Sequence, residues 1–351
     1  MSSRETNLAA FDTQADYCLA NDAPITAAAS LALRDALTEE NATGRAVLNW
    51  QGNPVADGLV LRLVGGLHRL WLDGKAPEID PLFEGQAEGM ASTAAVASVL
   101  ESHDTELLTW LDSPPQTNEP GRSASLMTGI LHIASRYPAQ PIEILEIGSS
   151  AGLNLLIDRF AFDLDGVKIG PADSPVLIKP DWRGPPPPQV NINFSSVRGC
   201  DVRPMDATDA VNERRLLAYV WQDHPQRFDR VAKSIAMQRE EAVNLVQADA
   251  ADWVEARLSE PQTEGTLRIL MHSIMWQYLT EDGKARITAA MEAAGAKATA
   301  QTPLGWVSVE ADRTFNRHDI TIRSWPDYGT PQLVGHSHAH GFWVQHLENK
   351  N

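Results

Sequence analysis

The chain has 351 residues, of which 43% are hydrophobic, and a formal net charge of −17. This hydrophobic content excludes a globally disordered chain, and the negative charge disfavours a nucleic-acid partner because it repels phosphate backbones. A small-molecule substrate is therefore expected. Only Cys18 and Cys200 are present, which argues against a disulfide framework or a cysteine zinc site. With no signal-like N-terminus and no apolar run of about 18 residues, we expect a cytoplasmic protein without membrane segments.

The first third of the chain is predicted to be helical. Residues 15–37 are rich in alanine and leucine with Pro24 as an interruption, and residues 60–72 carry apolar side chains at helical spacing. Residues 94–100 continue the pattern. Because this region holds no chemical motif, residues 1–111 are expected to form a helical N-terminal cap domain.

A break rich in proline, glycine and asparagine spans residues 112–123. It marks the start of a second domain, expected over residues 112–351. Ser123 is a suitable N-cap for a helix over residues 124–137, and Pro138 ends that helix.

A strand, a glycine turn and a helix are predicted next. Ile142–Ile147 is short, apolar and rich in β-branched residues, which indicates a buried strand. The turn Gly148–Gly152 follows, and apolar residues then predict a helix over 153–160. This order brings a Cβ-free backbone and a helix N-terminus to the carboxyl edge of a sheet, where open α/β sheets bind ligands. The alternative is that the two glycines serve only close packing.

Asp165-Gly166, between apolar residues, predicts a hairpin. It opens a proline-rich segment over residues 162–189 that we interpret as an insertion lying over the site. Trp182 and Arg183 in this segment are expected either to line a lid or to cover the edge of the sheet.

Strands and helices alternate as far as Met271, and further strands are predicted near residues 304–310, 319–325 and 341–346. This order predicts an α/β protein whose open sheet is mostly parallel, with an antiparallel edge strand.

Four segments carry a resemblance to known proteins. They are QTNEPGRSASL from residue 116, LEIGSSAGLNL from 145, RRLLAYVWQD from 214 and HSIMWQYL from 272. From the helix after Ser123 to the C-terminal strands, the chain resembles class I S-adenosylmethionine-dependent methyltransferases. As a whole it resembles a bacterial family of unknown function that carries this core. The resemblance implies a Rossmann-like domain and S-adenosyl-L-methionine as the cofactor.

The resemblance also implies which residues contact the cofactor. Asp201, in GCDV, matches the acid that binds the ribose hydroxyls, and Asp249, in VQADA, matches the residue that contacts the adenine amine. Asp201 lies further from the turn than is usual, and the insertion has to account for the excess. The end of the first strand and the turn supply Glu146, Gly148, Ser149, Ser150, Gly152 and Asn154. Ser150 takes the place of the second glycine of GxGxxG, which disfavours a nucleotide-dependent dehydrogenase.

Asn118 and Arg122 lie in the segment that, by the same resemblance, crosses the mouth of the cofactor site. The guanidinium of Arg122 suits bidentate recognition of the methionine carboxylate. The alternative is that Asn118 is a turn or cap residue and that Arg122 is solvated.

His272 and Tyr278 are the candidate catalytic residues, because methyltransferases of this class place catalytic groups after the fourth strand. A histidine can take the proton from an attacking oxygen or nitrogen. Methyl transfer needs mainly in-line positioning, so a structural role for His272 is the alternative.

His336, His338 and His340 alternate near the C-terminus, a spacing that can hold zinc. A loop that packs against the site is the preferred interpretation, and no metal is expected.

The predicted function is S-adenosylmethionine-dependent methyl transfer to a small molecule. The competing prediction is a non-catalytic regulatory protein that binds S-adenosylmethionine or a nucleoside, because a fold does not guarantee its chemistry.

Overall fold

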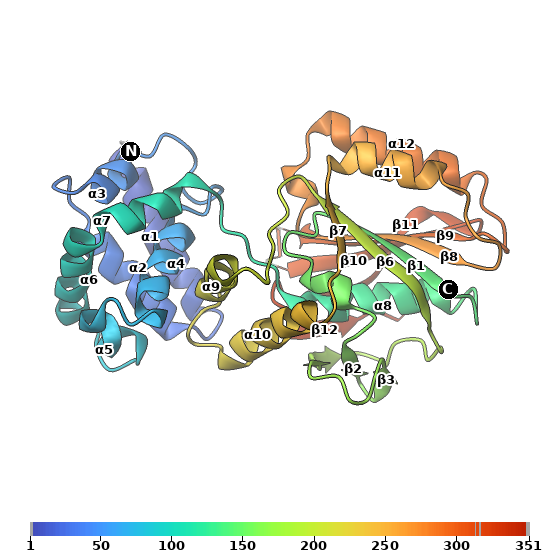
Figure 1. Cartoon of the computed structure of the whole chain (residues 1–351), viewed down its shortest axis with the longest axis horizontal. Helices are drawn as coiled ribbons and strands as arrows, with labels where there is room; N and C mark the ends of the chain where they lie inside the picture. The colour runs from blue at the N-terminus through green and yellow to red at the C-terminus, as the bar shows by residue number, and fades with distance from the viewer. Residues whose placement is uncertain (1–2, 313, 316, 349–351) are drawn as a thin grey trace. The chain divides into compact units, whose positions relative to one another are not determined.

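The computed structural model of the protein describes residues 3–312, 314–315 and 317–348. Over these residues the chain divides into two compact units (Figure 1). The first contains Met1–Thr117 and Asp209–Ala232, and the second contains Asn118–Thr208 and Lys233–Asn351.

The first unit is built from helices around an apolar core that includes Leu33, Leu63 and Phe83. Pro24 opens a helix, at a position where a proline has no helical hydrogen bond to lose. The helices are α1 (Ser3–Leu19), α2 (Pro24–Ala36), α3 (Ala42–Leu48), α4 (Leu59–Leu72), η1 (Pro77–Ile79), α5 (Asp80–Phe83), α6 (Met90–Ser102), α7 (Asp104–Leu108), η2 (Thr109–Asp112) and α9 (Ala210–Ala218). The helix α10 (Pro225–Glu240) begins in this unit and ends in the second.

A large sheet forms the second unit, and in the described residues it has nine strands in the order β5-β12-β11-β10-β9-β8-β1-β6-β7. The strands are β1 (Ile142–Ile147), β5 (Asp181–Arg183), β6 (Phe194–Asp201), β7 (Asn244–Gln247), β8 (Leu267–Ser273), β9 (Leu304–Asp312), β10 (Arg317–Trp325), β11 (Tyr328–Ser337) and β12 (Trp343–His346). The predicted mixed α/β class with a mostly parallel sheet is confirmed.

The antiparallel part of the sheet is larger than predicted. The pairs β9–β10, β10–β11 and β11–β12 are all antiparallel, and the edge strand β5 runs parallel to β12. Antiparallel neighbours need only a short connection, so the C-terminal strands follow one another across the sheet without intervening helices. The expected single antiparallel edge strand is therefore wrong.

Strand β1 marks the point where the order of parallel strands reverses. It pairs with β6 on one side and with β8 on the other, and β7 and β9 continue outward. After β1 the chain continues to β6 on one side of β1, and after β8 it continues to β9 on the other side. Open sheets of this kind leave a ligand-sized crevice there, at the carboxyl ends of the strands.

Helices cover both faces of this sheet (Figure 1). The helix α8 (Ser123–Ala134) packs on one face, where Ile144 belongs to its core. The helices α11 (Ala250–Ser259) and α12 (Glu281–Gly295) cover the other face, where Leu145 belongs to the core. Because successive strand residues point to opposite faces, β1 contributes apolar side chains to both cores and is buried along its length.

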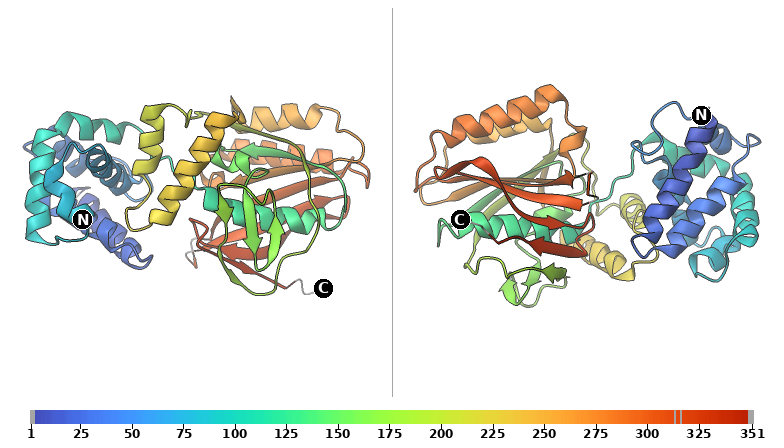
Figure 2. Two further views of the ribbon diagram at one scale, coloured as in Figure 1. Left: turned by 60° about the horizontal axis from the view of Figure 1, so that its bottom comes forward. Right: turned by 180° about the vertical axis from the view of Figure 1, so that it is seen from behind.

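The segment expected to lie over the site packs elsewhere. The hairpin predicted at Asp165-Gly166 is confirmed, since β2 (Ala161–Leu164) and β3 (Val167–Ile169) pair antiparallel around it. With β4 (Leu177–Ile178) they form a small sheet on the α8 side of the large one (Figure 2). Trp182 and Arg183 lie in β5, which pairs with β12 and forms the edge of the sheet.

The helix expected after the glycine turn is only a single 3-10 turn, η4 (Leu153–Leu156). The chain enters strand β2 at Ala161, so too few residues remain for a longer helix. The dipole of an α-helix is therefore not available at this turn, and ligand contacts there depend on side chains and on individual backbone groups.

A pair of buried histidines ties α8 to the C-terminal strand. The Nε2 atoms of His132 and His346 are 2.7 Å apart, and His346 Nδ1 donates to the Pro185 carbonyl at 2.8 Å. The hydrogen of the bond between the two Nε2 atoms can come from either ring, according to the tautomers. Burial, followed by the nearby His346 and Arg136, lowers the pKa of His132 to about 4.

We expect this pair to make the protein acid-sensitive. The unfolded His132 binds a proton below about pH 6.5, whereas the folded one does so only near pH 4, so stability is lost as the pH falls through this window. Between pH 8 and pH 4, the protonation of His132 should lower the free energy of unfolding by up to about 3 kcal/mol. The variant His132→Gln should not show this decrease when its free energy of unfolding is measured by urea denaturation. His103→Gln, at a partly exposed position, is the control, and equal pH slopes for all three proteins would contradict the expectation.

Candidate functional site

The turn after β1 has an unusual backbone in which every second residue is left-handed. Gly148, Ser150 and Gly152 have φ values of 68°, 55° and 74°. A glycine adopts this conformation without cost, but a serine rarely does. Ser150 therefore has the backbone of a glycine position.

Asp201, the last residue of β6, holds this turn in place. Its Oδ2 accepts the Ser150 N–H at 2.8 Å, and its Oδ1 accepts the Arg203 N–H at 2.8 Å. The Ser149 N–H donates to the carbonyl of Cys200 at 3.1 Å, which joins the same two segments. A carboxylate offers about four acceptor positions, so Asp201 keeps some for the ribose hydroxyls predicted to bind there.

Glu146 ends β1 with a buried carboxyl group that is only 2% exposed. Its Oε2 has no hydrogen-bond partner among the residues that the structure describes. Burial raises the pKa of Glu146 to about 7, which Ser149 and Arg122 counteract and Asp201 reinforces. A buried acceptor without a partner is costly, and perturbed carboxyl groups of this kind are enriched at functional sites.

The three predicted acids lie around one cysteine. Burial and the charges of Asp201, Glu146 and Asp249 together raise the pKa of the Cys200 thiol to about 12. Asp249 also caps α11, where its Oδ1 accepts the N–H groups of Ala251 and Asp252 at 2.9 and 3.1 Å. The fold thus brings the ends of β1, β6 and β7 together, as the prediction requires.

Asn118 and Asn154 fasten the turn to the start of α8. Asn118 Oδ1 accepts the Leu153 N–H at 2.6 Å, and Asn154 Oδ1 accepts the hydroxyl of Ser123 at 2.9 Å. Both side chains are buried. Their oxygens are engaged within the protein, so their role in this structure is to position the turn.

Arg122, at the end of η3 (Pro120–Arg122), is buried. Its Nε donates to the Ala339 carbonyl at 2.9 Å, so the histidine-rich loop packs against it. The charge of Arg122 lowers the pKa values of both Glu146 and His318. The solvated alternative for Arg122 is therefore wrong, and the side chain places a positive charge at the carboxyl edge of the sheet.

His272, near the end of β8, pairs with Glu310 of β9. The distance from His272 Nδ1 to Glu310 Oε1 is 2.7 Å. An ionised carboxylate only accepts, so Nδ1 carries the proton of the neutral ring and Nε2 is an acceptor. His272 is 1% exposed, and within the described ranges its Nε2 has no hydrogen-bond partner. The ring stacks on Trp276 at 5.0 Å with an interplanar angle of 16°.

Tyr278 does not share this environment. It ends η5 (Trp276–Tyr278), and 73% of its surface is exposed. The phenol is largely in solvent, and its catalytic role stays a prediction.

Glu310 and His318 were missed in the sequence. The charge of Glu310 acts on His318, whose pKa is lowered to about 4 by burial and then by Arg122. The two residues are near each other only because β9 and β10 form a hairpin in which Glu310 lies opposite Asp319. The available signal was the position of each at a strand end, but using it requires the register of the hairpin.

The histidine-rich tail is absorbed into local packing. His336 Nδ1 bonds to Asp319 Oδ1 at 2.7 Å, and His338 stacks on Phe342 at 4.7 Å. Residues 3–312, 314–315 and 317–348 contain no group of three or more His, Cys, Asp or Glu side chains arranged to hold a metal.

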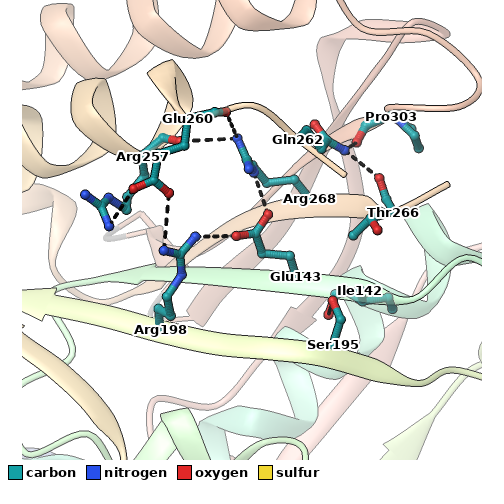
Figure 3. A network of polar contacts seen from close by, with 10 residues as sticks. All are labelled: Ile142, Glu143, Ser195, Arg198, Arg257, Glu260, Gln262, Thr266, Arg268 and Pro303. Atoms are coloured by element: carbon teal, nitrogen blue, oxygen red, sulfur yellow. Dashed lines mark hydrogen bonds and ion pairs between the residues drawn. The ribbon is translucent and has the colours of Figure 1, made fainter. Parts of the chain in front are cut away.

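A cavity of about 380 Å³ opens at the opposite end of the strands, between α11 and α12. Beside it, Glu143 pairs with Arg198 and, at 2.7 Å, with Arg268 (Figure 3). Arg198 also contacts Glu260 at 3.2 Å. These ion pairs offset most of the charge that the network buries. Since open α/β sheets bind ligands at the carboxyl ends of strands, we assign this network to the stability of the amino edge.

The comparison with protein families identifies one match. A model described as "Uncharacterized protein conserved in bacteria (DUF2332)" covers residues 8–346. The chain belongs to this family. Searches of curated proteins and of solved structures found no match. Within the part of the chain that is described, no helix has both the length and the apolar character needed to cross a membrane.

Replacing Glu146 should reveal the cost of its buried charge. The folded carboxyl holds its proton up to about pH 7, while the unfolded one releases it near pH 4.5, so folding loses stability as the pH rises through this window. Glu146→Gln should be about 1–3 kcal/mol more stable than the unmodified protein at pH 8 and unchanged at pH 4.5. Urea denaturation measures this, with exposed Glu264→Gln as the control. A variant destabilised equally at both pH values would contradict the assignment.

Proposed function

We propose that the chain binds S-adenosylmethionine at the turn Gly148–Gly152 and transfers the methyl group to a small-molecule acceptor. The strand order supports this. Numbered along the chain, the five parallel strands β7, β6, β1, β8 and β9 are the third, second, first, fourth and fifth, which is the order of a Rossmann-like domain. The antiparallel strands that follow are an addition to that core.

The observation that carries the proposal is the buried Glu146 Oε2, which has no partner in the described chain, beside a left-handed turn. The hydroxyl of Ser150 is likewise buried and unbonded to any described residue. Such groups suit a ligand rich in hydrogen-bond donors, as a nucleoside is. The remaining acceptor positions of Asp201 and Asp249 add to this set.

Both glycines of the turn lie close to a neighbouring side chain. A Cβ on Gly152 would lie 2.9 Å from Val243, and one on Gly148 would lie 2.7 Å from Met275. Gly152 therefore serves close packing, as the alternative interpretation of the glycines required. The cofactor contacts are accordingly proposed for Gly148, Ser149 and Ser150, and the side chain of Met275 rests on the first of these.

The chemistry at the acceptor is proposed for His272. When bound, S-adenosylmethionine supplies an electrophilic methyl group that passes to a nucleophile placed in line with it. His272 Nε2 accepts the proton that an O–H or N–H nucleophile releases. Glu310 holds the ring in this tautomer and stabilises the imidazolium cation that results. Arg122 provides the positive charge for the methionine carboxylate of the cofactor.

The acceptor is proposed to be a small molecule because the net charge of −17 disfavours nucleic acid. The buried position of His272 agrees with an acceptor that is enclosed on binding.

Two helix caps provide a matched test. Asp249 Oδ1 caps α11, and Asp209 Oδ1 caps α9 in the same way, accepting Val211 N–H and Asn212 N–H at 3.0 Å each. Asparagine caps helices as well as aspartate, so both Asp→Asn variants should keep the melting temperature. In isothermal titration, Asp249→Asn should weaken binding of S-adenosylhomocysteine about tenfold, through loss of a charged acceptor for the adenine amine.

Asp209→Asn should bind S-adenosylhomocysteine as the unmodified protein does. No heat and no thermal shift with the unmodified protein at millimolar S-adenosylhomocysteine would overturn the proposed cofactor, and equal affinities for both variants would overturn the role of Asp249.

A further inference from the structure

The turn proposed to bind the cofactor is covered by Met275. A Cβ placed on Gly148 would lie 2.7 Å from both Cβ and Cγ of Met275. The methionine side chain therefore rests directly on the backbone of the turn. A ligand that occupies the Cβ side of Gly148 has to displace it.

The residue before Met275 has a strained backbone. Ile274 has a φ of 52°, which a β-branched side chain strongly disfavours. Its N–H donates to the Val309 carbonyl at 2.9 Å. Such conformations persist only where the surroundings enforce them, and they cluster at ligand clamps and switch segments.

One carboxylate oxygen enforces this conformation. Glu310 Oε1 accepts the N–H groups of Met275 and Trp276 at 3.2 and 3.3 Å, in addition to His272 Nδ1 at 2.7 Å. The side chain of Glu310 is 23% exposed, so water can compete for it. Trp276, which stacks on His272, completes the attachment of the segment.

We propose that Ile274–Trp276 is a gate that closes the glycine turn, with Glu310 as its latch, and that the structure has the gate closed. The inference rests on the proposed function. Binding of the cofactor displaces Met275 from Gly148, breaks the two backbone contacts to Glu310 and allows Ile274 to leave its strained conformation. Only molecules with an open gate bind the cofactor, so the apparent affinity equals the affinity of the open form multiplied by the fraction of molecules that are open.

The decisive variants are Met275→Ala and Met275→Leu in the full chain. Alanine removes the side chain from Gly148, so S-adenosylhomocysteine should bind at least about threefold more tightly in isothermal titration, mainly through faster association. Leucine keeps the bulk and should behave as the unmodified protein. Unchanged or weaker binding by Met275→Ala would overturn the gate, because it would make Met275 a fixed packing or ligand-contacting residue.

Amide hydrogen exchange provides a second test, because a Met275 that only packed on the turn would not produce the pattern expected of a gate. S-adenosylhomocysteine should speed exchange at Met275 and Trp276, which lose Glu310 as acceptor, while slowing it at Ser149 and Ser150. Slower exchange in both segments would overturn the gate.

A ligand-free measurement separates the two claims. If the gate exists, the amide hydrogens of Met275 and Trp276 exchange through local opening. They should then exchange faster than those of Leu270 and Met271 in β8, and low concentrations of urea should not change their rates. Exchange of all four amides at one common rate would overturn the gate whatever the ligand does. Local opening in a protein that gives no heat with S-adenosylhomocysteine would instead overturn only the proposed cofactor.

Discussion

The hydrogen bond from the Ser150 N–H to Asp201 Oδ2 joins the turn after β1 to the end of β6. It fixes a serine in a backbone conformation that normally requires glycine. Glu146 lies before this turn, and Leu153, bonded to Asn118, lies after it. This carboxylate at the end of a neighbouring strand therefore acts together with the Ser149–Cys200 and Leu153–Asn118 bonds to hold the turn between Glu146 and the loop leading into α8.

Polar side chains at the two ends of the parallel strands differ in their partners. At the amino edge, Glu143 is paired with both Arg198 and Arg268. At the carboxyl edge, Glu146 Oε2 and His272 Nε2 are buried acceptors without partners in the described residues. Unsatisfied buried acceptors reduce stability, so their presence beside the glycine turn agrees with a functional role, although buried polar atoms without a described partner, such as Arg198 Nε, occur elsewhere in the fold as well.

The strand and turn over 142–152 follow from sequence because their determinants are local: β-branched residues, then glycines. The hairpin at Asp165-Gly166 is local for the same reason, and it also explains the missing helix, since the chain must enter β2 at Ala161. Glu310 and Asp319 meet only through the register of β9 and β10, which local patterns do not reveal. Ser150 was identified as a departure from a glycine motif, but its left-handed backbone depends on Asp201, 51 residues away.

A crystal structure of the full chain grown with saturating S-adenosylhomocysteine tests the central claim most directly. The account predicts electron density for the nucleoside at the carboxyl edge, with its ribose on Asp201, its adenine near Asp249 and the Met275 side chain away from Gly148. Density only in the cavity between α11 and α12, or none with Met275 still on the turn, would contradict it.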